Sequence, residues 1–222
     1  MSLMFTARFA RIALPAALLL SLAGCEDPTK DKPKATISTA APAQTQAAAA
    51  PAGPAEALPL DAAASTIGFV GSKVTGKHEG KFEKISGSIT LAGGKAAGGK
   101  LTVEADASSV KTDAEKLDGH LKSPDFFDVE KYPKATFTST EIKAGGEKGA
   151  THTITGELDL HGVKKTITFP ATITEGADAV SGSAEFVINR KDFGIVYPGK
   201  QDDLIRDDVL LKLSLKAPRK QG

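Results

Sequence analysis

The stretch "DDVLLKLSLKAP", residues 207–218, decides the fold class, because its apolar residues recur at every second position. From Val209 to Ala217 the odd-numbered residues are all apolar, whereas Leu210, two lysines and a serine take the positions between them. Successive side chains of a β-strand point to opposite faces, so this pattern predicts a strand that is buried on one side only.

The same alternation recurs through the residues that precede this stretch. It is repeated in "GKLTVEADA" (99–107) and "HTITGELDL" (152–160), and further strands are predicted over residues 66–75, 81–91, 135–142, 164–174 and 179–190. Gly-rich segments such as "AGGKAAGG" separate them. About eight strands joined by short turns predict an all-β fold, either a closed antiparallel barrel or a two-sheet sandwich. An eight-stranded barrel encloses enough space for side chains or for one small ligand.

Between residues 110 and 133 the alternation stops, over a length too great for an ordinary hairpin. Thr112, with Glu115 three residues later, matches a capping box and predicts the start of a helix. Ser123 followed by Pro124 predicts the start of a second helical turn. We therefore expect a helical crossover between two strands.

Phe126 and Phe127 lie in this crossover among charged residues. As ordinary core, the two rings would plug one end of the barrel and contribute roughly 1.5 to 3 kcal/mol each. Alternatively, the same rings line the portal of a cavity. The sequence leaves both interpretations open, and both can hold together.

Composition excludes several classes of function. The 222 residues suit one domain, and the formal net charge of +1 becomes −1 (1 − 2) if Arg8 and Arg11 are removed with a signal peptide. This balance gives no electrostatic footprint for nucleic acid. No phosphate-binding glycine loop, nucleophile elbow, zinc-type spacing or EF-hand motif is present, so we predict neither a metal nor a cofactor.

The first 24 residues are predicted to be a signal peptide, with two arginines before an apolar run at residues 12–22. This run is shorter than the ~20 residues that span a bilayer. The ending "LAGC" resembles a bacterial lipobox, which makes Cys25 a lipid attachment site; two or more acyl chains anchor a protein stably, whereas one does not. The alternative is a secreted protein with a chance cysteine. Because Cys25 is the only cysteine, no disulfide can form within the chain.

Residues 25–60 are predicted to be the lipidated cysteine followed by a disordered tether. They are rich in Ala, Pro, Thr and Gln and contain almost no large apolar residue, so they bury too little surface to fold. The folded domain is expected over residues 61–222.

Arg190, His120 and His161 are the candidates for contact with a ligand's head group. Arg190 ends the apolar row of the strand predicted at 179–190, where a charge must be paired or meet an anion. It is either a head-group ligand at the barrel mouth or a structural ion pair or rim residue, the second being favoured. His120 lies in the crossover, and His161 precedes Gly162 at a hairpin corner. The four histidines are far apart and have no cysteine partner, so no metal site is predicted.

Three ordered segments resemble the YceI-like, polyisoprenoid-binding, lipocalin-like domains of bacterial envelopes. They are "GHLKSPDFFDVEKYPKATFTST" (119–140), "GELDLHGVKKTITF" (156–169) and "INRKDFGI" (188–195), followed by an Asp-rich turn and the final strand. The resemblance implies an eight-stranded antiparallel lipocalin-like barrel with a short helical crossover insertion. Between "DFGI" and the last strand, "YPGKQDDLIRDD" is longer and more charged than the family pattern leads us to expect.

The resemblance also implies a long apolar tunnel that holds an isoprenoid or another long-chain fatty amphiphile, and several family members are dimers. The cavity residues expected on this chain are Phe69, Phe82, Leu101, Val103, Phe126, Phe127, Phe137, Leu158, Leu160, Phe169, Phe186, Ile188, Leu211 and Leu213. A bound isoprenoid-like lipid is expected in place of a cofactor.

The sequence thus predicts a non-enzymatic protein, tethered to a membrane of the bacterial cell envelope and facing the periplasm, that binds, sequesters or carries such a lipid. A first alternative is an envelope stress-related scaffold or interaction module whose barrel is filled by its own side chains. A second is an enzyme that uses His120, His161 or Asp125, which requires two of these groups within hydrogen-bond reach in one cleft.

Overall fold

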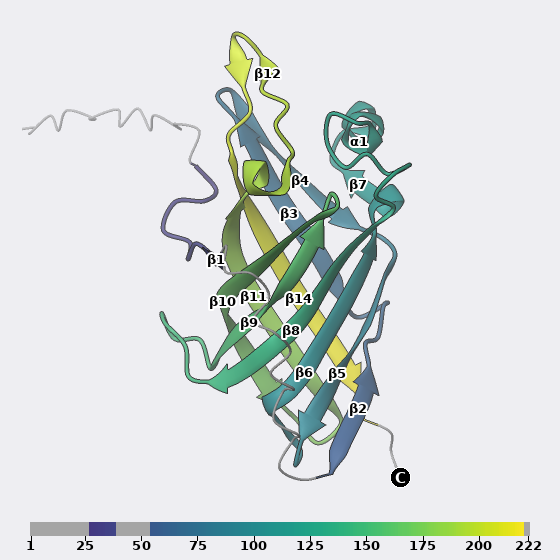
Figure 1. The fold of residues 1–222 in the computed structure, drawn as a ribbon, viewed down its shortest axis with the longest axis vertical. Helices are drawn as coiled ribbons and strands as arrows, with labels where there is room; N and C mark the ends of the chain where they lie inside the picture. Colours follow the sequence, from purple (N-terminus) through teal and green to yellow (C-terminus); the bar gives the residue numbers. More distant parts are fainter. Residues whose placement is uncertain (1–26, 39–53, 220–222) are drawn as a thin grey trace, which may run out of the picture.

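The computed structural model describes residues 27–38 and 54–219 of the chain, and within them nearly all regular structure is β-strand (Figure 1). In chain order the strands are β1 (Thr36–Ser38), β2 (Ala55–Pro59), β3 (Thr66–Lys73), β4 (Gly76–Phe82), β5 (Ile85–Ala92), β6 (Lys95–Asp106), β7 (Val110–Thr112), β8 (Lys134–Ala144), β9 (His152–Leu160), β10 (Val163–Glu175), β11 (Ala179–Asn189), β12 (Gly199–Lys200), β13 (Asp203–Leu204) and β14 (Asp208–Pro218). The helical elements are α1 (Glu115–Lys122) and the 3₁₀ helices η1 (Ala107–Ser109) and η2 (Arg190–Phe193).

Twelve strands form one antiparallel sheet that curls into an elongated barrel (Figure 1). The order is β2-β5-β6-β8-β9-β10-β11-β14-β3-β4-β7, with β1 added beside β10. The sheet closes on itself because β7 follows β6 across η1 and pairs with β4 on the far side. A small β12–β13 hairpin and α1 stand at one end of the barrel (Figure 1), which we call the mouth.

The predicted all-β, antiparallel, lipocalin-like barrel with a helical crossover is therefore confirmed. The strands described are more numerous than the eight expected, because short strands flank the long ones. The period-2 pattern finds long half-buried strands, whereas strands of two or three residues contain too few alternations to be recognised.

The single strand predicted over residues 81–91 is wrong. The chain leaves β4 at Phe82 and begins β5 at Ile85. Phe82 packs against an apolar cluster and Ile85 is buried, yet they are three residues apart, so no continuous strand can turn both inward. β4 itself, "GKHEGKF", was missed because it contains one large apolar residue.

The capping box predicted at Thr112 is also wrong. Ala114 is the N-cap of α1, without a side-chain capping bond, and Thr112 lies in β7. Ser123 ends α1 as its C-cap and also begins the predicted turn over residues 124–127, where its carbonyl accepts from the Phe126 N–H at 3.0 Å and its hydroxyl from the Asp125 N–H at 3.4 Å. The pattern misled because the Thr112 hydroxyl donates to the Asp118 carboxylate on α1, and a short sequence pattern does not distinguish this bond from capping.

The N-terminal segment adds a strand where β10 and β11 separate from each other. β10 and β11 pair only at the far end from the mouth, from Thr172↔Ser183 to Glu175↔Val180. Nearer the mouth, residues 33–38 lie between them: the Ala35 N–H donates to Val187 O, and β1 pairs with β10 through Ile37↔Ile167.

Ala35 and Ile37 pack against the barrel core from this segment. Ion pairs hold the same segment to the barrel, at 2.7 Å between Asp27 and Arg206 and between Lys34 and Asp208. Strand β2 likewise pairs with β5 ahead of residue 61. The division into tether and domain stays a prediction, but β1 and β2 both lie within the expected tether.

Candidate ligand-binding cavity

The barrel contains a cavity of about 190 Å³ that extends from its middle to the mouth. We call it the upper cavity. Its wall is built from the inward positions of the long strands, as Ile188 and Phe186 on β11 and Leu211 and Leu213 on β14 illustrate. Since side chains alternate between faces along a strand, the same pattern that specifies the sheet also lines its interior with hydrocarbon.

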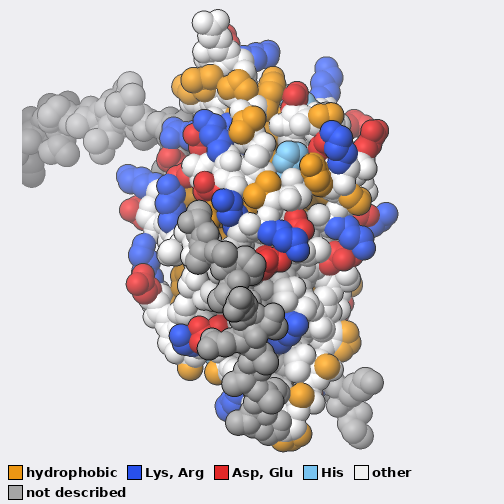
Figure 2. Space-filling model, in the orientation of Figure 1, with side chains coloured by type: hydrophobic (Ala, Val, Ile, Leu, Met, Phe, Trp, Pro, Cys, Tyr) orange, Lys and Arg blue, Asp and Glu red, His pale blue; other side chains and the backbone are white. Residues whose placement is uncertain are grey.

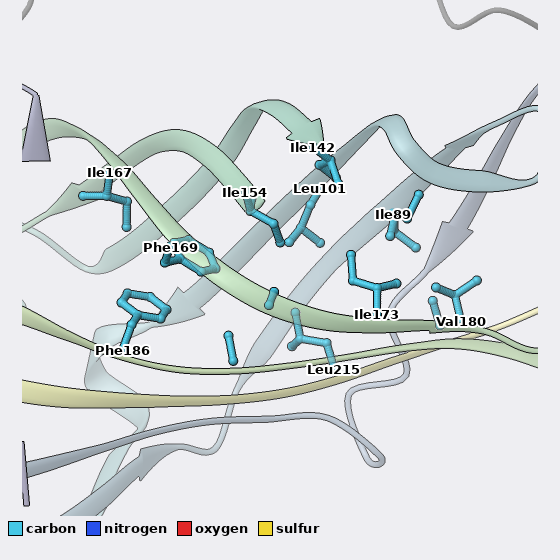
Figure 3. Packing of buried hydrophobic residues seen from close by; sticks show 14 of the residues in the cluster. Ile89, Leu101, Ile142, Ile154, Ile167, Phe169, Ile173, Val180, Phe186 and Leu215 are labelled. Carbon is cyan, nitrogen blue, oxygen red and sulfur yellow. The ribbon is translucent and has the colours of Figure 1, made fainter. Parts of the chain in front are cut away.

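The structure places all fourteen residues predicted as cavity candidates in the wall of the upper cavity. Figure 3 shows several of these inward side chains, with the rings of Phe169 and Phe186 side by side. Whether these residues touch a ligand stays a prediction.

Sequence reasoning did not name several other wall residues. Ile67, Ile167 and Leu215 have the inward parity of their strands and could have been found from the alternation. Ile195 and Ile205 flank the β12–β13 hairpin outside any long strand, so no periodic signal marked them. Gly71 lies in the wall on β3, and a Cβ atom added there would meet nothing within 4 Å.

The two phenylalanines of the crossover cover the mouth. Phe127 lies against Phe82 and Phe69, with ring centroids 5.6 and 6.4 Å apart, while Phe126 lies 5.5 Å from the ring of Tyr197. Phe126 is buried, and both rings line the upper cavity. Both rings thus pack at the barrel end and form part of the cavity wall, and whether a ligand passes between them stays a prediction.

Asp118 fixes α1 above this mouth. Its Oδ1 accepts hydrogen bonds from the Thr112 backbone N–H at 2.6 Å and from the Thr112 hydroxyl at 2.7 Å, and Lys111 Nζ lies 2.8 Å from Oδ2. The bonds from Lys111 and Thr112 lower the pKa of Asp118 to about 2. The carboxylate is therefore charged at neutral pH and joins α1 to β7.

Arg190 is buried at the mouth end of the cavity, and its guanidinium donates hydrogen bonds to oxygens of the protein itself. Nη1 donates to Ile195 O at 2.7 Å and Nε to Arg206 O at 3.1 Å, while Nη2 lies 3.3 Å from both Ile205 O and Asp207 Oδ1. Burial lowers the pKa of Arg190, an effect that the nearby Asp207 carboxylate opposes. These contacts favour the structural interpretation over the head-group one.

Neither histidine candidate lines the upper cavity. His120 Nε2 lies 2.9 Å from Asp125 Oδ2, with both side chains well exposed. His161 adopts a positive φ of 55°, its Nδ1 lies 3.2 Å from Phe193 O, and its ring meets Tyr132 with centroids 4.8 Å apart. His120 and Asp125 are within hydrogen-bond reach, as the enzyme alternative requires, but they stand outside the cavity.

The surface adds little for other ligand classes. On the face shown in Figure 2, basic and acidic side chains are interspersed, and apolar side chains gather near the mouth end. Among the described residues, no cluster of three or more His, Cys, Asp or Glu side chains is suited to a metal ion. None of the helices in the described ranges has the length and apolar character needed to cross a membrane. The predicted signal peptide and Cys25 lie outside the described residues.

Comparison with known proteins places this geometry in a family. The family model described as YceI-like domain matches residues 59–217. A UPF0312 protein of Pseudomonas putida (strain W619) is 38% identical over 136 residues, which are 59% of this chain and 70% of that protein.

Solved structures share the fold. Burkholderia cenocepacia BcnA superposes with a TM-score of 0.62 at 26% identity, over 71% of this chain and 99% of BcnA. A polyisoprenoid binding domain from Saccharophagus degradans, described as implicated in plant cell wall breakdown, gives a TM-score of 0.58 at 22% identity, over 73% of this chain and 98% of that domain. The matched residues include the whole barrel from β3 to the inward residues of β14. The chain therefore belongs to the YceI-like domain family.

Proposed function

We propose that this protein binds the hydrocarbon chain of an isoprenoid or another long-chain amphiphile inside its barrel and carries or sequesters it in the bacterial cell envelope without chemical change. The observation that carries the proposal is the wall of the upper cavity. Arg190 is the one charged side chain among the described wall residues, and its donors are already used by protein acceptors. Such a wall offers burial to hydrocarbon and no free charge to a polar substrate.

Burial alone can supply the affinity. Each buried CH₂ contributes about 0.8 kcal/mol, less the cost of ordering the chain. A wall of this kind discriminates weakly between chains of similar width, so chain length and the group left at the mouth would determine the ligand. The polyisoprenoid binding described for the Saccharophagus degradans domain supports an isoprenoid as the first ligand class to test.

The two alternatives receive less support. A barrel filled by its own side chains does not fit a cavity of about 190 Å³ that reaches the mouth. An enzyme built on His120 and Asp125 would act at a well-exposed pair outside the cavity, with no enclosed site for a substrate. Dimer formation stays a prediction of the family resemblance.

The proposal is tested by replacing a glycine in the wall of the upper cavity with a larger residue, which fills part of the cavity. An added Cβ at Gly71 meets no atom within 4 Å, so the fold of Gly71→Leu should persist while the ligand loses volume. We expect full-length wild-type protein to co-purify with about one amphiphile per chain, identified by native mass spectrometry and organic extraction, and Gly71→Leu to retain at least tenfold less, equivalent to about 1.4 kcal/mol.

Gly119→Leu is the matched control. Gly119 is exposed on α1 with no atom within 4 Å of an added Cβ, so the same substitution there should leave occupancy unchanged. A wild-type protein that purifies empty and takes up neither prenyl alcohols nor isoprenoid quinones would overturn the proposal and favour the scaffold.

The envelope location belongs to the same proposal and rests on Cys25. We expect the protein, produced in a Gram-negative host, to incorporate an alkyne analogue of palmitate and to fractionate with membranes. Cys25→Ala should lose the label and the membrane association together. Labelling that persists in Cys25→Ala, or a wild-type protein that is never labelled, contradicts lipidation at this residue.

A further inference from the structure

A second, smaller cavity of about 40 Å³ lies in the barrel on the side away from the mouth. We call it the lower cavity. Its described wall consists of aliphatic residues, Phe169 and one glycine, including Ile154, Ile173 and Val180. Hydrocarbon would be as stable there as in the upper cavity, because neither wall presents a free charge.

Four residues line both cavities: Leu101, Phe169, Leu213 and Leu215. They come from β6, β10 and β14, which are separated around the sheet by β8 and β9 on one side and by β11 on another. The residues shared by the two cavity walls thus come from well-separated parts of the barrel wall and lie between the cavities. They form a constriction between the two cavities.

Phe169 is the largest of the four and is held firmly. It is only 2% exposed, and its ring stacks on Phe186 with centroids 4.1 Å apart and planes 13° from parallel. The ring of Phe137 contacts it from another side, with centroids 5.6 Å apart. Figure 3 shows Phe169 beside Phe186, with Leu101, Ile154 and Leu215 beyond it toward the lower cavity.

We infer that Phe169 sets the length of chain that the barrel accepts, by closing the upper cavity against the lower one. This inference rests on the proposed function. The barrier is steric, since both cavities are apolar. A chain longer than the upper cavity leaves its excess at the mouth, where added CH₂ groups remain in water and contribute no affinity.

The experiment measures affinity against chain length. Full-length wild-type protein and Phe169→Ala are titrated with geraniol, farnesol and geranylgeraniol, which contain two, three and four isoprene units. Wild-type affinity should rise with length and then stop rising. In Phe169→Ala the rise should continue for at least one further unit, at roughly fourfold per CH₂ newly buried, less the ordering cost.

Phe193→Ala is the matched control, because Phe193 is buried among the core residues but lines neither cavity. It removes the same ring without joining the cavities, so the length at which affinity stops rising should not move. Phe169→Leu keeps more of the core volume and decides the question if Phe169→Ala does not fold. If wild type and the Phe169 variants share the same length limit, the inference is overturned and the proposed function still stands. If wild type binds none of the alcohols, the proposed function itself is overturned.

Discussion

Arg190→Met is expected to lower the free energy of unfolding by about 3 to 5 kcal/mol, since each buried polar group left unpaired costs about 1 to 3 kcal/mol. Arg190 is 4% exposed, and its guanidinium donates to three carbonyl oxygens, those of Ile195, Ile205 and Arg206. Methionine fills a similar space and donates nothing, so these oxygens lose their partner. Urea unfolding of the full-length protein measures the change.

Lys191→Met is the matched control. Lys191 is the next residue and also reaches Asp207, at 3.0 Å, but its side chain is 48% exposed. Exposed ion pairs contribute about 0 to 1 kcal/mol, so this variant should remain near wild-type stability.

The two interpretations of Arg190 also differ in binding. If Arg190 held an anionic head group, Arg190→Met would remain stable and would lose affinity for a fatty acid relative to the matching alcohol. We expect the opposite: a large loss of stability and no change in the ratio of the two affinities, measured at a temperature where the variant is folded. A stable variant with a changed ratio contradicts the structural role.

Gly156→Ala is expected to lower the free energy of unfolding by about 3 kcal/mol, at the upper end of the usual cost of overpacking a core. Gly156 lies in β9 opposite Ser139 of β8. An added Cβ would lie 2.5 Å from both Phe137 Cζ and Thr138 O, and 2.7 Å from Ser139 Cα. The ring could move, but the two backbone atoms belong to a paired strand and cannot yield without disturbing the sheet.

Gly182→Ala provides the comparison. It is also a strand glycine without a left-handed φ, but an added Cβ there meets nothing within 4 Å. Its stability should stay within about 1 kcal/mol of wild type, the size of an ordinary strand preference. Thermal and urea unfolding of the two variants check the difference, and equal stabilities would show that the sheet at Gly156 yields more easily than its contacts imply.

The barrel and the lining of its cavity could be predicted from sequence because both follow from the alternation of side chains along a strand. Leu211 and Leu213 face inward wherever β14 is paired, since covalent geometry places every second side chain on the same face. The same rule failed at residues 81–91. There β4 ends and β5 begins three residues later, and the inward-facing positions change from even to odd residue numbers.

The crossover was predicted in position but not in detail. The loss of alternation after residue 110 located it, and the two phenylalanines indicated that it covers apolar surface. The capping pattern at Thr112 was misleading because its hydroxyl donates to the carboxylate of Asp118, whereas Ser123 does begin a turn, directly after it ends α1. Which hydrogen-bond partner a short polar side chain meets is settled by how the neighbouring backbone folds.

The sequence by itself determined the all-β class, the inward faces of the long strands and the apolar character of the space between them. Only the tertiary structure decided that residues 33–38 fill the gap between β10 and β11. It also decided that the Arg190 guanidinium donates to three backbone carbonyls and that Phe169 lies between two cavities. Side-chain parity is a local consequence of backbone geometry, so a sequence displays it directly. Contacts such as those of Ile37 with Ile167 join residues far apart in the chain, and which of the many possible pairings forms depends on the topology and closure of the whole sheet.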